Sequence, residues 1–404
     1  MLNSKRKLSH ILSGVVFILI LKSPYLYGVS KEEQKAIDSL NVLAVMPTSG
    51  SLSAFGEEVH LAMQLAITHL KGTEAELASH FNFNLLDNKG SPNLTKSLLT
   101  DYLNKNAVQI LIGSIGETAS QTIATIASEN QKIFISPFVA ITAMQKEVDF
   151  QPLNLVLDEA QQAYLMAGFA AQHLNSKVAA VIRPELSRKP HILGEAFSKY
   201  FKEMGLVSNQ FSLPEKSQEI LTLLKNLKEQ QVTSILLPFS LNRAEPILKA
   251  LQTMNWAVPI LATENWDSLA LTQLSESQKS LNIFMLEHYH LDVNTHLNKK
   301  FSSDFFTQNN RKASTIGALA YDAIILAAHA YKNAKSALPK SLSKAIVRHS
   351  PYSGLMGDYR INASRQINRP VVMTQTQRGK KTPISLLNLE NEKLNVVLLG
   401  KADL

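Results

Sequence analysis

The clearest hydrophobic pattern lies between residues 108 and 140. A short apolar run from Val108 to Ile112 ends at Gly113, which is typical of a strand buried on both faces. From Thr118 to Asn130 apolar residues recur at helical spacing, and residues 133–135 form a second apolar run. This order predicts two parallel strands joined by a crossover helix.

The same alternation of apolar runs and amphipathic segments extends through most of the chain. Ahead of this unit, it predicts strands at 42–47 and 81–86 and helices at 57–70 and 93–104. A second series starts with a helix at 159–174 and continues with strands at 178–182, 234–238, 258–261 and 283–286. The sequence therefore predicts an α/β fold with two doubly wound parallel-sheet lobes.

The order of the elements also predicts how the lobes are joined. Crossings of the chain near residues 155, 286 and 352 would form a three-strand hinge, which allows a cleft between the lobes to open and close. The first lobe is expected to comprise residues 41–155 and 288–350, and the second residues 156–286 and 353–404, ending in a meander of short strands.

Loops that follow parallel strands are the first candidates for a binding site. Backbone N–H groups and helix N-termini gather at the carboxyl ends of such strands and suit anionic groups. Ser114–Thr118 and Pro137–Ala140 are two loops of this kind. Taken alone, they are equally compatible with polar turns that bind nothing.

Composition and charge narrow the possible functions. The 404 residues are 45% hydrophobic and 18% charged, as in a globular protein. The net charge of +8 includes four basic residues and no acidic residue within positions 1–28, which leaves 8 − 4 = +4 for the rest of the chain. A charge this small and scattered does not favour nucleic-acid binding.

The amino-terminal region resembles an export signal. Residues 1–28 contain a basic start at Lys5–Lys7 and an apolar core at Ile11–Leu21, which is too short to span a bilayer. The chain contains no cysteine, which excludes disulfides, thiolate metal sites and a cysteine-linked lipid anchor. These features predict a soluble, non-lipidated periplasmic protein without stable membrane insertion.

The sequence contains no recognisable set of catalytic residues. Residues 113–116 lack the third glycine of a dinucleotide-binding loop and the lysine of a phosphate-binding loop. No Gly-x-Ser-x-Gly or His-Glu-x-x-His motif occurs. His288 and His290 alternate on one segment, but no acid or thiol completes a metal-ligand set. We therefore expect no enzymatic activity, no cofactor and no metal.

Six short segments, taken in order, resemble the leucine-binding branch of the type I periplasmic binding proteins. These are the substrate-binding proteins of branched-chain amino acid ABC importers. The likeness covers residues 41 to about 379 and implies a Venus-flytrap fold of two hinged lobes. The segments are Gly50–Gly56, Asp87, Ile112–Ser120, Ile135–Pro137, Ala262–Asn265 and Ala320–Ala323.

The resemblance implies a site for an amino acid between the lobes. In that family, loops matching 114–120 and 137–140 bind the ligand carboxylate, an aromatic residue matching Phe55 packs on the ligand, and an acid matching Glu264 binds the ammonium group. Three positions depart from the family pattern: Glu117, Leu193 and Phe138, which stands where small residues are common. Glu117 together with Glu264 would favour a cationic solute. The expected binding residues are Phe55, Ser114, Gly116, Glu117, Thr118, Phe138, Val139, Ala140, Glu264 and Trp266.

Two functions of different classes remain open at this point. One is a periplasmic receptor that captures an amino acid or similar small zwitterionic solute and delivers it to a membrane ABC permease. The other is an envelope protein of the same fold that binds no small ligand and regulates a partner such as a cell-wall synthase.

Overall fold

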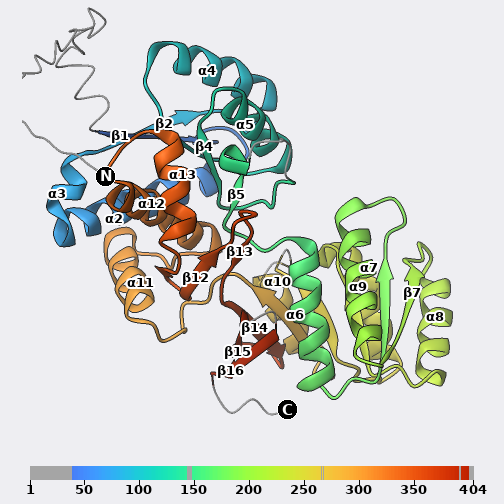
Figure 1. Cartoon of the computed structure of the whole chain (residues 1–404). Helices are drawn as coiled ribbons and strands as arrows, with labels where there is room; N and C mark the ends of the chain where they lie inside the picture. Colours follow the sequence, from blue (N-terminus) through green and yellow to red (C-terminus); the bar gives the residue numbers. More distant parts are fainter. Residues whose placement is uncertain (1–38, 143–147, 265, 267, 391–392, 400–404) are drawn as a thin grey trace, which may run out of the picture.

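The computed structural model describes residues 39–142, 148–264, 266, 268–390 and 393–399, so the expected export signal lies outside the described residues. The described chain folds into two α/β lobes (Figure 1). Lobe 1 combines the first third of the chain with helices from its last third, which appear as blue and orange segments packed together. The predicted fold class is confirmed.

Lobe 1 is built on a five-stranded parallel sheet with the order β2-β1-β3-β4-β5. Alternate residues of β1 face opposite sides: Val42 packs with helices α2 and α12, whereas Leu43 packs with α4 and α5. Helices therefore cover both faces, which explains the uninterrupted apolar runs. The strands are β1 (Leu40–Met46), β2 (Phe81–Asp87), β3 (Ile110–Gly113), β4 (Ile133–Ser136) and β5 (Leu153–Asn154). The helices are α2 (Ser53–Thr73), α3 (Ala75–Ser79), α4 (Pro92–Lys105), α5 (Glu117–Glu129), η1 (Val148–Phe150), α11 (His296–Asn309), α12 (Thr315–Ala334) and α13 (Pro339–Arg348).

Lobe 2 is built on an eight-stranded sheet with the order β16-β15-β14-β10-β9-β8-β6-β7. The five strands from β7 to β10 are parallel, and β14, β15 and β16 extend the sheet in antiparallel fashion. The strands are β6 (Val178–Arg183), β7 (Val207–Ser212), β8 (Ser234–Leu237), β9 (Ile260–Thr263), β10 (Ile283–Glu287), β14 (Val371–Gln377), β15 (Lys380–Glu390) and β16 (Lys393–Leu398). The helices are α6 (Glu159–Gln172), α7 (Arg188–Glu203), α8 (Ser217–Glu229), α9 (Leu241–Thr253) and α10 (Ser268–Ser277).

The third crossing between the lobes differs from the expected position near residue 352. Strands β11 (Tyr352–Gly354), β12 (Gly357–Ile361) and β13 (Ile367–Asn368) form a small separate sheet. This sheet packs on lobe 1, because the Tyr352 hydroxyl donates to Ala345 O at 3.2 Å and Leu355 N donates to Asp322 Oδ1 at 3.1 Å. The chain therefore enters the sheet of lobe 2 only after β13, close to Arg369.

A buried ion pair ties this third crossing to the rest of the hinge. The Arg369 guanidinium donates to Leu155 O on the first crossing at 2.9 Å and to Asp322 Oδ2 on helix α12 at 3.0 Å. Both charged side chains are almost fully buried, with relative exposures of 3% for Arg369 and 2% for Asp322. A buried charge is tolerated only when it is paired and hydrogen-bonded, so these contacts fix where the two crossings meet.

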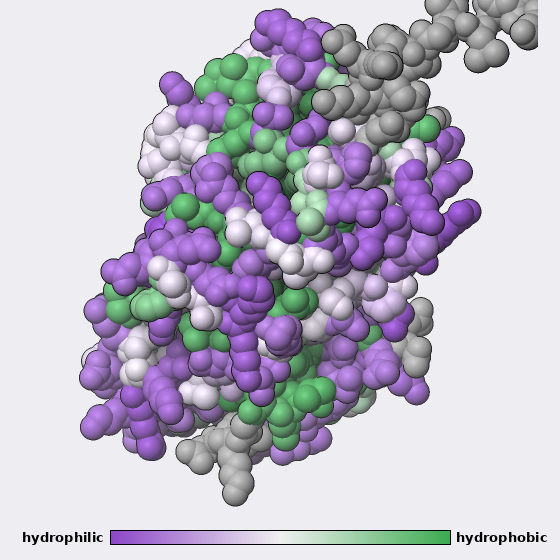
Figure 2. All heavy atoms as spheres, turned by 90° about the vertical axis from the view of Figure 1, so that its left-hand side faces the viewer, coloured by the Kyte–Doolittle hydropathy of each residue, from purple (hydrophilic) through white to green (hydrophobic). Residues whose placement is uncertain are grey.

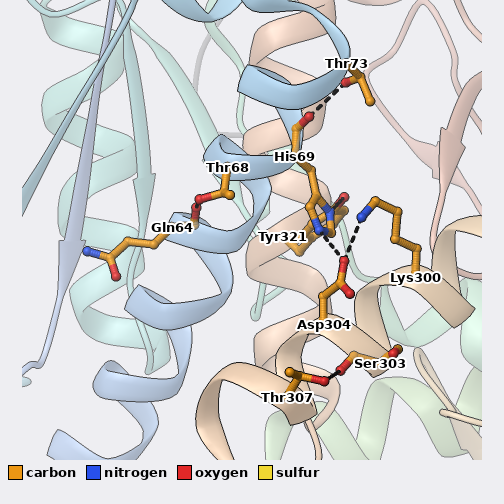
Figure 3. A network of polar contacts seen from close by, with 9 residues as sticks. All are labelled: Gln64, Thr68, His69, Thr73, Lys300, Ser303, Asp304, Thr307 and Tyr321. Carbon is orange, nitrogen blue, oxygen red and sulfur yellow. Dashed lines mark hydrogen bonds and ion pairs between the residues drawn. The ribbon is translucent and has the colours of Figure 1, made fainter.

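A second polar network fastens three helices of lobe 1 to one another (Figure 3). His69 of α2 contacts the Tyr321 hydroxyl of α12 at 2.8 Å through Nδ1 and Asp304 Oδ2 of α11 at 2.9 Å through Nε2. Lys300 donates to the same carboxylate oxygen at 2.6 Å. Because Tyr321 can donate to a neutral Nδ1, the network is complete when His69 is uncharged.

We expect His69 to titrate below its ordinary value of 6.5, because burial lowers its pKa more than the Asp304 carboxylate raises it. The folded protein then binds this proton more weakly than the unfolded chain does. The contribution of His69 to the free energy of unfolding is complete above pH 6.5 and is lost as the pH falls through the lower folded-state value. An NMR titration of the imidazole measures the midpoint, and a midpoint at or above 6.5 would contradict the expectation.

On the face shown in Figure 2, hydrophilic side chains cover most of the surface and hydrophobic atoms form patches between them. Within the described ranges, no helix combines the length and apolar composition needed to cross a membrane.

Candidate functional site

A cavity of about 560 Å³ lies between the two lobes, beside the hinge. Lobe 1 contributes the loop after β4 and the first residue of α5, and lobe 2 contributes the starts of α6, α7 and α9 and the end of β9. The floor is formed by Val156 and Leu157 of the first crossing and His288 of the second. The cavity therefore sits at the carboxyl ends of both parallel sheets, where ligands of open α/β folds bind.

The loop after β4 supplies the apolar wall of lobe 1. Phe138, Val139 and Ala140, three of the expected binding residues, all line the cavity. The loop is held in shape because the Ser136 hydroxyl donates to Val139 O at 2.6 Å. Its far end is fixed by paired hydrogen bonds of 3.0 Å between the Asn154 side chain and the backbone of residue 141.

The loop after β3 contributes less than expected. Ser114 is fully buried, and its hydroxyl accepts a hydrogen bond from Asn88 Nδ2 at 3.0 Å. The Ser120 hydroxyl accepts from Ser114 N at 3.0 Å and donates to Ser114 O at 2.7 Å. The Ser120 hydroxyl therefore binds its own loop, and the Ser114 hydroxyl binds the loop after β2, so both are engaged within lobe 1. Of the candidates in this loop, Glu117 lines the cavity, whereas Ser114, Gly116 and Thr118 do not.

Glu117 forms an ion pair that bridges the lobes. Its Oε2 lies 3.2 Å from Nζ of Lys189 on α7, and the same ammonium group lies 3.7 Å from Oε1 of Glu159 on α6. The two glutamates thus share one lysine. The sequence suggested that Glu117 would repel a bound carboxylate or attract a cation. Lys189 offsets part of that charge, because it is shared with Glu159.

Reversing the charge of Lys189 is expected to favour the open form of the free protein. A partly exposed ion pair stabilises by about 0–1 kcal/mol, so its loss in Lys189→Glu lowers the ratio of closed to open forms by up to about fivefold. Repulsion between the introduced glutamate and Glu117 lowers the ratio slightly further. Small-angle X-ray scattering measures the accompanying change in radius of gyration. The matched double variant Glu117→Lys/Lys189→Glu should restore the original radius, and a double variant that remains open would show that the bridge does not control closure.

Glu264 lies on the opposite wall, immediately after β9, and its carboxylate is held by His288. Its Oε2 accepts the backbone N–H of His288 at 3.0 Å, and its Oε1 lies 2.7 Å from His288 Nδ1. Burial acts to raise the pKa of Glu264, but the proximity and hydrogen bonds of His288 and the charge of Arg369 together lower it. Glu264 is therefore an oriented carboxylate, ionised at neutral pH, on the wall of the cavity.

Two expected aromatic contacts lie outside the cavity lining. Phe55 is 47% exposed at the start of α2 and does not line the cavity. Trp266 is buried behind the wall, where its Nε1 donates to Phe239 O at 2.5 Å. Because Phe239 itself lines the cavity, Trp266 supports the wall and does not form part of its surface. The structure thus brings together Glu117, Phe138, Val139, Ala140 and Glu264 out of the ten candidates.

Several lining residues were not singled out as ligand contacts from the sequence. Lys189 follows a polar loop and resembles any solvated lysine until Glu117 is placed beside it. Arg243, at the start of α9, lines the cavity and takes part in no ion pair among the described residues. His288 and His290 were weighed only as metal ligands, and within the described ranges no cluster suited to a metal ion occurs.

Two hinged lobes with a polar-edged cavity between their strand ends define the class of two-lobed solute-binding folds. A family model described as periplasmic binding protein matches residues 39–381. The chain belongs to this family. No curated protein matches the chain significantly.

Solved structures of similar fold include amino acid and aromatic acid binding proteins. A leucine-binding protein from Thermotoga maritima is 20% identical, with 86% of this chain and 98% of that chain covered and a TM-score of 0.67. A branched-chain amino acid substrate-binding protein from Streptococcus pneumoniae, in complex with isoleucine, is 19% identical, with coverages of 89% and 99% and a TM-score of 0.65. A solute-binding protein from R. palustris in complex with benzoate is 16% identical, with coverages of 86% and 96% and a TM-score of 0.62. At these identities the likeness establishes the fold.

Proposed function

We propose that this protein is an exported receptor that captures an amino acid or similar small zwitterion between its lobes and delivers it to an ABC importer of the membrane. The observation that carries the proposal is the oriented Glu264 carboxylate on the wall of an interlobe cavity, opposite the apolar loop 138–140. A carboxylate of this kind suits an ammonium group, and the apolar loop suits an aliphatic or aromatic side chain.

The walls of the cavity carry charges of both signs, as a zwitterion requires. Glu117 and Glu159 share Lys189, so Glu264 is the acid whose charge faces the solute most directly. Arg243 supplies a cation on the wall of lobe 2. Because the hydroxyls of Ser114 and Ser120 are engaged by other groups of lobe 1, we assign Arg243 to the solute carboxylate, together with backbone N–H groups.

The volume and position of the cavity fit capture by lobe closure. About 560 Å³ lies within the range of about 300–1,000 Å³ that is typical of small-molecule sites. Contacts from both walls are complete only when the lobes are closed, so the solute shifts the population towards the closed form. In this proposal a permease recognises that form. Membership of the family and the signal-like residues 1–28 support a periplasmic location.

Isothermal titration of the purified chain against the common L-amino acids and benzoate tests the proposal. We expect at least one α-amino acid to bind, and the same compound without its amine to bind more weakly. Binding of benzoate alone would redirect the proposal to aromatic acids. If no compound of the panel binds and the protein captures a cell-wall synthase from envelope extract, the regulatory alternative would replace this proposal.

A further inference from the structure

The hinge contains a buried histidine that touches the cavity on one side and the first crossing on the other. We propose that His288 is a positioning residue that orients the Glu264 carboxylate and couples it to the hinge at Leu157. The part of this inference that concerns solute affinity rests on the proposed function. The part that concerns the hinge does not require any ligand.

The hydrogen bonds around His288 determine its protonation. Leu157 N–H donates to Nε2 at 2.9 Å, so Nε2 must carry a lone pair. The proton of the neutral ring is therefore on Nδ1, which donates to Glu264 Oε1 at 2.7 Å. With a relative exposure of 2%, the side chain is shielded from competing water. The donors then run in one direction, from Leu157 through His288 to Glu264.

This arrangement leaves Glu264 available for a ligand while fixing its direction. Two N–H donors of His288 bind the two carboxylate oxygens, and the carboxylate retains further lone pairs. The Glu264 side chain is 27% exposed and lines the cavity. A pre-oriented acceptor binds a cationic group more strongly than a mobile one, because less conformational entropy is lost.

The same chain of hydrogen bonds connects the cavity to the moving part of the fold. Leu157 lies on the first crossing, His288 on the second, and Glu264 at the end of β9 in lobe 2. Arg369 on the third crossing binds Leu155 O, two residues before Leu157. Rotation of the lobes about these strands therefore alters the environment of the Glu264 carboxylate, and a cation bound there stabilises the hinge geometry that orients it.

Two amide substitutions separate the two halves of the proposal. In His288→Asn the side-chain amide replaces Nδ1 and can still donate to Glu264, but nothing accepts from Leu157. In His288→Gln the amide reaches the position of Nε2 and can accept from Leu157, but the side-chain donor to Glu264 is lost and only the backbone N–H remains. Each variant thus serves as the control for the other, and circular dichroism confirms that both are folded.

Amide hydrogen exchange of Leu157, measured by NMR on the ligand-free protein, tests the hinge contact. We expect exchange at Leu157 to accelerate at least tenfold in His288→Asn and to stay within about threefold of wild type in His288→Gln. Equal exchange rates in the two variants, or unchanged protection in His288→Asn, would overturn the coupling whether or not any solute binds.

Affinities for L-leucine and for 4-methylpentanoate, which lacks the amine, test the orientation of Glu264. We expect His288→Gln to reduce the preference for leucine by about tenfold or more and His288→Asn to keep it within about threefold. If both variants lose both compounds equally, His288 has only a structural role and the proposal is overturned. If the wild type binds neither compound, the proposed function fails for this solute and the exchange measurement still decides the hinge contact.

Discussion

Replacing Arg369 by methionine is expected to lower the free energy of unfolding by about 3–5 kcal/mol, as measured by urea denaturation at pH 7. The substitution leaves the Asp322 carboxylate buried at 2% exposure without its counter-charge, and it leaves Leu155 O without its donor. Methionine fills much of the space, so the loss arises chiefly from the unpaired charge and not from a cavity.

Two variants make this result interpretable. Lys105→Met removes an ion pair with Asp101 in which both side chains are more than 60% exposed, and it should change stability by less than about 0.5 kcal/mol. Arg369→Met/Asp322→Asn should recover part of the loss, because asparagine is neutral and can still accept from Leu355 N. An Arg369 variant as mild as the surface control would mean that the pair does not hold the hinge.

The hinge is thus held together by polar side chains of the second and third crossings, which bind the backbone of the first. Arg369 joins the third crossing to the first and to helix α12, and His288 joins the second crossing to the first. Both contacts end on backbone groups of residues 155–157. The short segment between β5 and α6 therefore carries hydrogen bonds from the two other crossings, and its position fixes the floor of the cavity.

The alternation of strands and helices was predictable because it depends on local periodicity. The unit from Val108 to Ile135 has the predicted order of strand, helix and strand, since its apolar residues pack on both faces of a parallel sheet. The third crossing was not predictable in this way. Residues 352–368 alternate like any exposed sheet, and only the contacts of Tyr352 and Leu355 assign them to lobe 1.

The residues of the candidate site were predictable where their place in the site depends only on the strand that they follow. The loop 138–140 lines the cavity because it follows an inner parallel strand. Ser114 follows such a strand too, but its hydroxyl is bound by Asn88, which is 26 residues away in sequence. Lys189 and His288 gain their roles from Glu117 and Glu264 in other parts of the chain, and a single sequence does not specify those pairings.

Replacing Glu264 by glutamine is expected to weaken binding of an amine-bearing solute by about 10–100-fold, because a hydrogen bond to a charged group contributes about 1.5–3 kcal/mol. The amide removes the negative charge that faces the ammonium group. It also places an NH₂ group against one of the two N–H donors of His288, which both need acceptors. Isothermal titration with L-leucine, or with another amino acid that binds, measures the change.

Glu117→Gln is the matched control, because it removes an acid from the other wall whose charge Lys189 already offsets in part, and its effect should stay within about fivefold. The deaminated analogue separates the remaining explanations. If Glu264 binds the ammonium group, Glu264→Gln weakens the amine and leaves the analogue nearly unchanged. Equal losses of affinity for both compounds would show that Glu264 maintains the structure of the hinge and does not bind the ammonium group. Unchanged binding of the amine would place the ammonium group elsewhere in the cavity, and Glu117 and Glu159 would then be the remaining acids on its wall.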